Sequence, residues 1–357
     1  MLNATGKKTA APDNGASGGR IPGIEQIPGT KWNPAIERIP KPERIPILER
    51  LKGFGWKFEG RDIPFGVGCA YYGGPADGDY RDTLAADLKL LERIYSLGIR
   101  YYDTSRSYGN SEQSLGEFIS RIDRSTIFLA TKSRYPFRED KKAFDVFRGN
   151  FFESFERLKT DYIDLFQIHD TDHFDCCERQ VMPFLLEQRE KGLIGYIGIG
   201  TRSLNALELA IMSGNVDSVL SYINYSLLKR SAANVIDLAK KRGVSFVNAS
   251  VLHFGTIKHP APLNPDEPVY GYRARNLRAV APMQDLCREM GVDIVHAALQ
   301  YSLLNPGIAM TLNGIRRESN IDSTVEAMRA AIYPEQWARI FALQELDPYL
   351  YVQDDLY

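Results

Sequence analysis

The chain has 357 residues, of which 25% are charged and 44% are hydrophobic. This composition is typical of a globular protein and excludes disorder over most of the length. The 44 Lys and Arg residues nearly balance the 45 Asp and Glu residues, which leaves a formal net charge of −1. We therefore expect neither nucleic acid nor a membrane as partner, because both attract strongly basic proteins.

Residues 1–46 are rich in Gly, Pro, Lys and Arg, and the tripeptide Arg-Ile-Pro recurs at 20–22, 38–40 and 44–46. Proline removes a backbone donor and fixes φ, so this segment is expected to be an extended, irregular N-terminal arm. Two hypotheses stay open for it. The arm is either a flexible tail, or it docks over one end of the fold that follows or on a neighbouring subunit, which would make a homo-oligomer possible.

Apolar runs and helical periodicities alternate after the arm. Phe144, Phe147, Phe151, Phe155 and Leu158, for example, lie at helical spacing. The predicted strands are 63–68, 99–104, 127–131, 162–168, 193–199, 216–223, 244–248 and 308–312. The predicted helices are 84–96, 111–121, 144–158, 179–191, 204–212, 231–242, 276–290, 293–303 and 321–331.

Eight apolar strands, each followed by a helix, indicate an α/β protein with a parallel sheet covered by helices. A closed (β/α)8 TIM barrel over residues 47–332 is favoured over a doubly wound sheet. No Gly-x-Gly-x-x-Gly stands between a strand and a helix, as a dinucleotide-binding sheet would require. Residues 333–357 are expected to be a C-terminal tail.

Two further patterns bear on the compartment. The four cysteines are too few for a disulfide framework, and the first 19 residues hold no apolar stretch like that of a signal peptide. The uncharged stretch 294–315 is interrupted by Asn305-Pro306-Gly307, so it is interpreted as a buried helix, a turn and a strand. We expect a cytoplasmic protein without a membrane span.

Polar residues follow three consecutive predicted strands, and the active site of a barrel lies at these ends. Asp103 and Tyr108 follow the second strand, Lys132 the third and His169 the fourth. A neighbouring ammonium group lowers the pKa of a tyrosine, and a carboxylate keeps the lysine charged. The sequence therefore predicts a general acid/base suited to interconversion of a carbonyl and an alcohol.

The motifs 102–116 (YDTSRSYGNSEQSLG), 128–133 (FLATKS), 158–169 (LKTDYIDLFQIH) and 192–200 (GLIGYIGIG) resemble those of the aldo-keto reductases. Segments 220–225 and 248–252 resemble the branch that contains the L-galactose and D-threo-aldose dehydrogenases. The resemblance implies a (β/α)8 barrel and an NAD or NADP cofactor, which supplies the hydride chemistry. It also implies Tyr108 as acid/base, Asp103 and Lys132 as the residues that tune it, and His169 as the residue that orients the substrate.

The resemblance further predicts a set of cofactor contacts, and this chain departs from the common pattern at some of them. Tyr222 stands where many members have Gln, and Ala249 where many have a stacking Tyr. Glu318, beside two arginines, disfavours an extra phosphate, so NAD is slightly favoured. The predicted cofactor-binding residues are Thr201, Ser221, Ser250, Leu252, Gly314, Arg316, Arg317, Asn320 and Thr324.

The run from His169 to Cys177 holds two His, three Asp and two Cys, which suggests a metal site. Adjacent cysteines rarely bind one zinc together, and no Cys-x2-Cys spacing is present, so no metal is expected. We expect a loop beside a small-molecule substrate instead. The candidate substrate-pocket residues are Tyr71, Tyr72, Asp172 and His173.

Three functions remain open at this point. The first is an NAD(P)-dependent oxidoreductase that interconverts carbonyl or lactone and alcohol or lactol on a sugar or another polyhydroxylated substrate. The second is the same chemistry on a non-sugar aldehyde or ketone, such as a pyridoxal-like compound or a natural product. The third is a nucleotide-binding regulatory subunit with slow turnover.

Overall fold

The computed structural model describes residues 45–135, 141–171, 173–258 and 271–351, without the side chains of 271–277 and 349–350. The predicted N-terminal arm lies outside these residues except for its last two residues. Asp172 and residues 352–357 also lie outside the described residues. The hypotheses about the arm and about an oligomer built through it therefore stay predictions.

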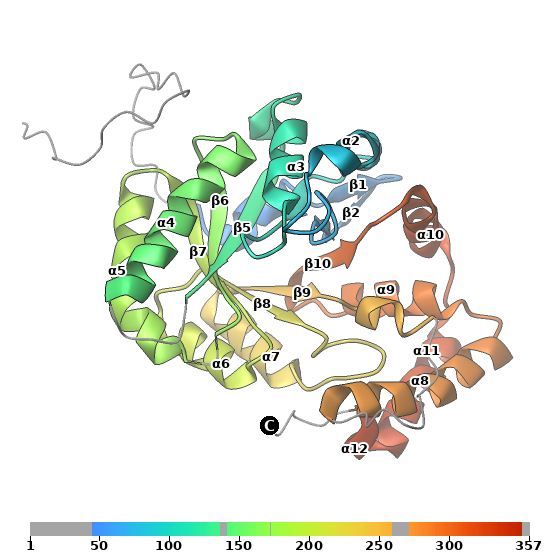
Figure 1. Cartoon of the computed structure of the whole chain (residues 1–357). Helices are drawn as coiled ribbons and strands as arrows, with labels where there is room; N and C mark the ends of the chain where they lie inside the picture. Colours follow the sequence, from blue (N-terminus) through green and yellow to red (C-terminus); the bar gives the residue numbers. More distant parts are fainter. Residues whose placement is uncertain (1–44, 136–140, 172, 259–270, 352–357) are drawn as a thin grey trace, which may run out of the picture. The chain divides into compact units, whose positions relative to one another are not determined.

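Eight parallel strands close into a barrel in the order β10-β3-β4-β5-β6-β7-β8-β9, which confirms the predicted (β/α)8 fold (Figure 1). Each strand is a short apolar run that is buried along almost its whole length, as expected where helices cover the sheet. The barrel strands are β3 (Phe65–Gly68), β4 (Tyr101–Asp103), β5 (Phe128–Arg134), β6 (Ile163–His169), β7 (Ile194–Gly200), β8 (Ser218–Tyr222), β9 (Ser245–Ala249) and β10 (Ile308–Gly314).

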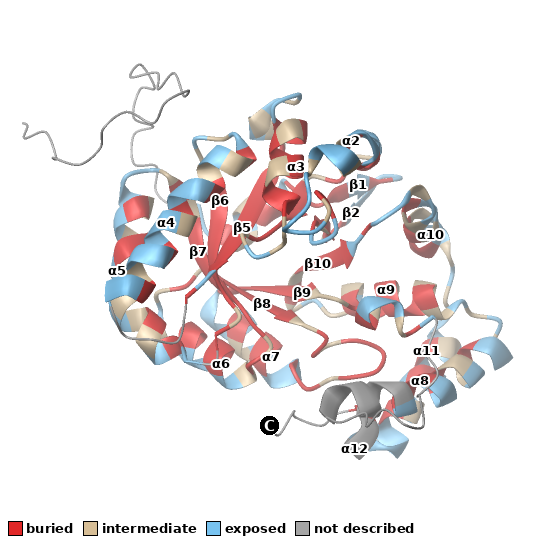
Figure 2. Ribbon diagram, in the orientation of Figure 1, coloured by how far each residue is buried: buried red, intermediate tan, exposed pale blue. Residues whose placement is uncertain are grey.

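Helices surround this barrel, and most of them bury one stripe while the other face is exposed (Figure 2). In α4, for example, Phe147, Phe151 and Leu158 are fully buried. The helices that follow strands are α2 (Arg81–Ser96), α3 (Ser111–Ile119), α4 (Lys141–Leu158), α5 (Phe174–Glu190), α6 (Leu204–Ser213), α7 (Ala233–Arg242), α8 (Gly271–Glu289), α9 (Ile294–Leu303) and α10 (Glu318–Arg329).

A short N-terminal element covers the interior of the barrel at the end opposite to the strand carboxyl ends. It contains α1 (Ile47–Lys52), and an antiparallel hairpin of β1 (Trp56–Phe58) and β2 (Arg61–Ile63) follows it. Ile47 and Leu51 pack in one buried cluster with the interior residues of the strands, such as Phe128. The hairpin is absent from the sequence prediction because strands of three residues show no usable periodicity.

Residues beyond 332 form two more helices, α11 (Pro334–Leu346) and α12 (Pro348–Tyr351), and both pack on α8. Trp337 and Ile340 of α11 are buried in a cluster with residues of α8 and α9. The backbone N–H of Arg230, in the loop after β8, donates to the carbonyl oxygen of Tyr351 at 2.7 Å. The segment that sequence patterns suggest to be a tail is therefore packed on the barrel as far as residue 351.

Among the described residues, no helix combines the length and the apolar character needed to cross a membrane. The uncharged stretch 294–315 forms α9, a turn and β10, as expected from the Asn-Pro-Gly interruption.

Candidate active site

The four predicted catalytic residues come together at the carboxyl ends of β4, β5 and β6. Lys132 and Asp103 are 1% and 4% exposed, and Nζ of Lys132 lies 2.5 Å from Oδ1 of Asp103. Nζ also donates to the carbonyl oxygen of Thr104 at 2.7 Å. Because both partners are withdrawn from water, each charge depends on the other for compensation.

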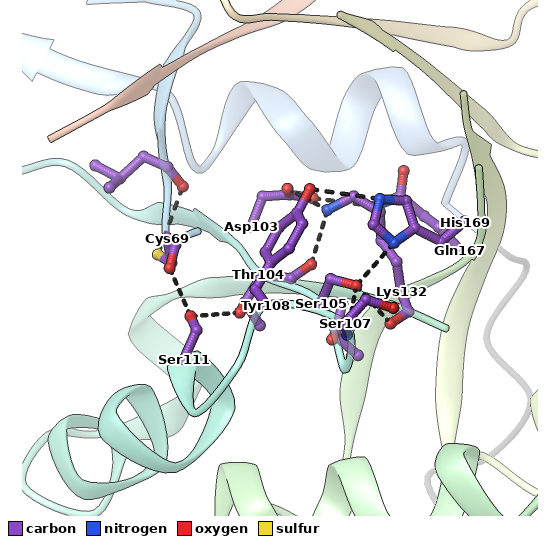
Figure 3. Close-up of polar contacts among 12 residues, drawn as sticks. Cys69, Asp103, Thr104, Ser105, Ser107, Tyr108, Ser111, Lys132, Gln167 and His169 are labelled. Carbon is purple, nitrogen blue, oxygen red and sulfur yellow. Dashed lines mark hydrogen bonds and ion pairs between the residues drawn. The ribbon is translucent and has the colours of Figure 1, made fainter. Parts of the chain in front are cut away.

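Tyr108 lies beside this ion pair and points toward His169 (Figure 3). The hydroxyl oxygen of Tyr108 is 3.5 Å from Nε2 of His169, and the two rings meet edge to face. Nζ of Lys132 lies 5.1 Å from the centre of the Tyr108 ring. An oxygen atom of a substrate placed between the hydroxyl and the imidazole would therefore contact both hydrogen-bonding groups.

The pKa of Tyr108 does not follow the simple expectation. Burial raises the pKa of Tyr108 above its ordinary value, and the nearby charge of Lys132 opposes this shift without reversing it. For Lys132, burial is the largest single effect and favours the neutral form, but the charge and hydrogen bond of Asp103 together with the neighbouring Tyr108 outweigh it, and the pKa is raised. At neutral pH the site therefore presents a protonated phenol next to a charged lysine, rather than a phenolate.

His169 is held as a neutral imidazole. Burial, followed by the charge of Lys132, lowers its pKa to about 3. Its Nδ1 lies 2.9 Å from Oγ of Ser105, and Ser105 in turn receives the backbone N–H of Ser107 at 3.1 Å. Ser105 thus holds the ring at Nδ1, while Nε2 faces the hydroxyl of Tyr108.

Sequence reasoning assigned no role to Ser105 or Gln167, although both lay within the quoted motifs. Nε2 of Gln167 donates to Oδ2 of Asp103 at 3.0 Å, so the two oxygens of Asp103 have different donors. Side chains two residues apart on a strand share a face. Gln167 lies two residues before His169 on the same strand. This spacing could have placed Gln167 in the site from the sequence.

The loop that carries Tyr108 is anchored at several points. Oγ of Thr104 and Oγ of Ser111 are 2.8 Å apart, and Ser111 donates to the carbonyl oxygen of Cys69 at 2.5 Å. Arg157 of α4 donates to the carbonyl oxygen of Gly109 at 2.6 Å. These contacts connect the loop to β3 and α4, so the phenol is held by the surrounding structure.

The nine predicted cofactor-binding residues lie at or after the carboxyl ends of β7, β8, β9 and β10, which adjoin one another in the barrel. Several of their hydroxyl groups are already bonded. Oγ of Ser221 receives Nδ2 of Asn224 at 3.0 Å, and Oγ1 of Thr201 receives the backbone N–H of Ser203 at 3.2 Å. Thr324 is buried and donates to the carbonyl oxygen of Asn320 at 2.8 Å. Ser250 and Leu252 are partly exposed.

Two arginines stand where β10 leads into α10. Arg316 and Arg317 are exposed, and neither has an ion-pair partner among the described residues. Arg317 is the N-terminal cap residue of α10, and its side chain makes no capping hydrogen bond. A helix N-terminus flanked by such residues suits a phosphate group. The residues present thus fit the phosphates of a dinucleotide.

The slight preference for NAD rests on Glu318, which should repel an extra phosphate. The contacts of Glu318 weaken this argument. Its carboxylate pairs with Nζ of Lys89 at 2.8 Å and with Arg93 at 3.6 Å, both on α2. These partners compensate its charge, and the hydrogen bond from Lys89 lowers its pKa. The repulsion that Glu318 was expected to exert on a further phosphate is correspondingly reduced.

The predicted substrate-pocket residues are placed differently from one another. Tyr72 is buried and donates to the carbonyl oxygen of Ile315 at 2.8 Å. Tyr71 is exposed, with the guanidinium of Arg316 4.5 Å from its ring centre. His173 is exposed at the start of α5. Asp172 lies outside the described residues.

The described residues contain no group of three or more His, Cys, Asp or Glu that could hold a metal ion. Two of the residues that had suggested such a site have other partners. Sγ of Cys177 lies 3.7 Å from Oγ1 of Thr171, and Asp175 lies 3.6 Å from Arg179.

Two buried neutral histidines predict the pH dependence of stability. Burial lowers the pKa of His169 and of His253 to about 3, whereas an unfolded chain protonates histidine below about 6.5. The unfolded state then binds more protons, so the free energy of unfolding falls as the pH drops from about 6.5 toward 3. Each histidine contributes on the order of a few kcal/mol, and denaturant unfolding at several pH values measures the slope.

The variant His253→Gln isolates one of these contributions. His253 is buried, with Nε2 2.6 Å from Oγ of Ser226. The variant is expected to lose stability at pH 7 but to show a shallower decline between pH 6.5 and 4 than the parent. An equal slope in both proteins would contradict the assignment.

Comparisons with known proteins agree with the barrel fold. L-galactose dehydrogenase of Arabidopsis thaliana is 31% identical over 250 residues, covering 67% of this chain and 76% of that protein. D-threo-aldose 1-dehydrogenase of a Pseudomonas species is 27% identical, covering 70% of this chain and 85% of that protein. The holo form of an aldo-keto reductase from Bacillus halodurans superimposes with a TM-score of 0.64 at 25% identity, over 81% of this chain and 95% of that one. The model of the aldo/keto reductase family matches residues 65–345, and the chain belongs to this family.

Proposed function

We propose that the protein is an NAD(P)-dependent oxidoreductase that interconverts a carbonyl, or lactone, and an alcohol, or lactol. The observation that carries this proposal is the hydroxyl of Tyr108 beside Nε2 of His169, with the buried pair of Lys132 and Asp103 behind it. Such an arrangement supplies a proton donor, a charge that stabilises the resulting phenolate, and a group that orients the substrate.

In the reductive direction Tyr108 donates its proton to the carbonyl oxygen of the substrate, and in the oxidative direction it takes the proton back. The charge of Lys132 stabilises the phenolate, and Asp103 keeps Lys132 protonated. Ser105 donates to the carbonyl oxygen of Lys132 at 3.1 Å and lies 2.9 Å from Nδ1 of His169, so it holds the imidazole with Nε2 facing the substrate oxygen. The nicotinamide ring, when bound, supplies or accepts the hydride.

We propose a sugar or another polyhydroxylated compound as substrate. The support is the similarity to L-galactose dehydrogenase and D-threo-aldose 1-dehydrogenase, and the polar residues around Tyr108 and His169. The test is a panel of aldoses and their lactones with NAD, NADP and the reduced cofactors, followed by the absorbance of the reduced nicotinamide. Turnover of at least one aldose is expected, and none with any cofactor would overturn the sugar assignment.

A second candidate is the same reaction on a non-sugar aldehyde. Pyridoxal 4-dehydrogenase of Microbacterium luteolum is 26% identical over 321 residues, covering 77% of this chain and 92% of that protein. Pyridoxal belongs in the same panel for this reason. Turnover of pyridoxal with no activity toward aldoses would favour this candidate.

The two arginines before α10 predict how the cofactors are distinguished. Arg316 and Arg317 can pair with the additional phosphate of NADP, which NAD lacks. Replacing both with Ala is expected to raise the KM for NADP about 10-fold or more, while the KM for NAD changes little. Steady-state kinetics with both cofactors measure this difference, and an equal rise for both cofactors would contradict the assignment.

A further inference from the structure

Asp170 is the first residue after β6 and follows His169 directly. Its φ is +48°, in the left-handed region that few residues other than glycine adopt, although Asp tolerates it. Consecutive residues of a strand point to opposite faces, so an extended backbone would turn this carboxylate away from the imidazole. The left-handed turn instead leaves Oδ2 of Asp170 3.6 Å from Nε2 of His169.

Two other elements contact the same carboxylate. The hydroxyl of Tyr222, at the end of β8, donates to Oδ1 at 3.1 Å, and Arg134, at the end of β5, donates to Oδ2 at 2.8 Å. Three strand ends thus fix one acidic group at the edge of the site. A backbone conformation of this kind persists where the surroundings hold it, and it is concentrated at functional sites.

The carboxylate of Asp170 can accept further hydrogen bonds. Two carboxylate oxygens accept about four hydrogen bonds, and the contacts to Tyr222 and Arg134 use one on each oxygen. The side chain of Arg134 is 62% exposed, and an ion pair with such a partner contributes little to stability. The ion pair with Arg134 therefore does not by itself account for the position of Asp170.

The free acceptor positions of the Asp170 carboxylate lie close to the place where the substrate carbonyl or hydroxyl oxygen would bind. A substrate oxygen bound by Tyr108 and His169 lies at Nε2 of His169, and Oδ2 of Asp170 is 3.6 Å from the same nitrogen. A hydroxyl on the carbon next to the reacting carbon is then within reach of the carboxylate of Asp170. In an aldose, this carbon carries a hydroxyl, which is a hydrogen-bond donor.

We propose that Asp170 is a specificity-determining residue that accepts a hydrogen bond from the substrate hydroxyl on the carbon adjacent to the reacting carbon. This inference rests on the proposed function of the site. Tyr222 positions the carboxylate for that contact. The preference is thus for a 2-hydroxy aldehyde or its lactol over an aldehyde without a hydroxyl at this carbon, because only the former satisfies the carboxylate.

The test compares the aldose turned over fastest in the panel with its 2-deoxy analogue. In the parent enzyme, kcat/KM is expected to favour the aldose by about 10- to 100-fold, the value of a hydrogen bond to a charged group. Asp170→Ala is expected to remove most of this preference by lowering kcat/KM for the aldose, with little change for the 2-deoxy sugar. Tyr222→Phe is expected to have a smaller effect in the same direction.

The control is Asp285→Asn on α8, where Asp285 forms an exposed ion pair with Arg288 outside the site. It is expected to leave both rates unchanged, and thermal melting of every variant reports whether the fold is intact. Equal losses for both sugars in a folded Asp170→Ala protein would overturn the proposal, because Asp170 would then act through His169 and not on the hydroxyl. No turnover of any aldose by the parent enzyme would instead be a failure of the proposed function.

Discussion

Replacing Tyr108 with Phe is expected to lower kcat by about 10²- to 10⁴-fold, the usual contribution of a positioned general acid or base. The variant removes one oxygen atom, which lies 3.5 Å from Nε2 of His169, and keeps the ring beside Lys132. Cofactor affinity is expected to stay within a few-fold of that of the parent. Steady-state kinetics with the best substrate of the panel and a cofactor titration by fluorescence measure both quantities.

A second tyrosine outside the site provides the control for this variant. Tyr95 of α2 bonds through its hydroxyl to Oγ1 of Thr126 at 2.8 Å, and Tyr95→Phe is expected to leave the rate unchanged. Unchanged rates in Tyr108→Phe would contradict the proposed mechanism. No turnover in the parent protein, together with tight nucleotide binding, would support the regulatory subunit among the functions the sequence leaves open.

Replacing Lys132 with Met is expected to abolish turnover and also to lower the free energy of unfolding by about 3–5 kcal/mol. The ammonium group is bonded to Asp103 and to the carbonyl oxygen of Thr104 in a site from which water is excluded. Its removal leaves the carboxylate of Asp103 buried without a counter-charge. Chemical denaturation at pH 7 measures the loss.

The double variant Asp103→Asn/Lys132→Met separates the lost charge compensation from lost packing. Asn keeps the shape of Asp and the hydrogen bond from Gln167 but removes the negative charge. The double variant is expected to be more stable than Lys132→Met and equally inactive, and the difference is the coupling energy of the pair. A double variant no more stable than Lys132→Met would show that the ion pair does not account for the loss.

The sequence alone determined the barrel and predicted which polar residues meet at one end of it. The aromatic stripe in α4 and the apolar runs of the strands have the periods of a helix and of buried strands, and these follow from local geometry. Strand ends of a parallel barrel meet at one face, so Tyr108, Lys132 and His169 could be placed together from chain order alone. Element boundaries were less certain, and α5 begins five residues before the predicted Arg179.

Other features depended on contacts between distant parts of the chain. The hairpin of β1 and β2 is too short to show a period, and α11 is identified by the burial of Trp337 against α8 and α9. The net rise in the pKa of Tyr108 was missed because burial, which exceeds the effect of Lys132, is a property of the folded site.

The position of Asp170 shows most clearly what the sequence determines and what depends on tertiary contacts. Its residue type stands in the sequence, but an alternating strand pattern would direct it away from His169. Only the left-handed turn, held by contacts from Arg134 and Tyr222, directs it back. Periodicity and motifs reveal which residues share a strand or a face, whereas side-chain direction and electrostatic balance arise from contacts that form only in the folded barrel.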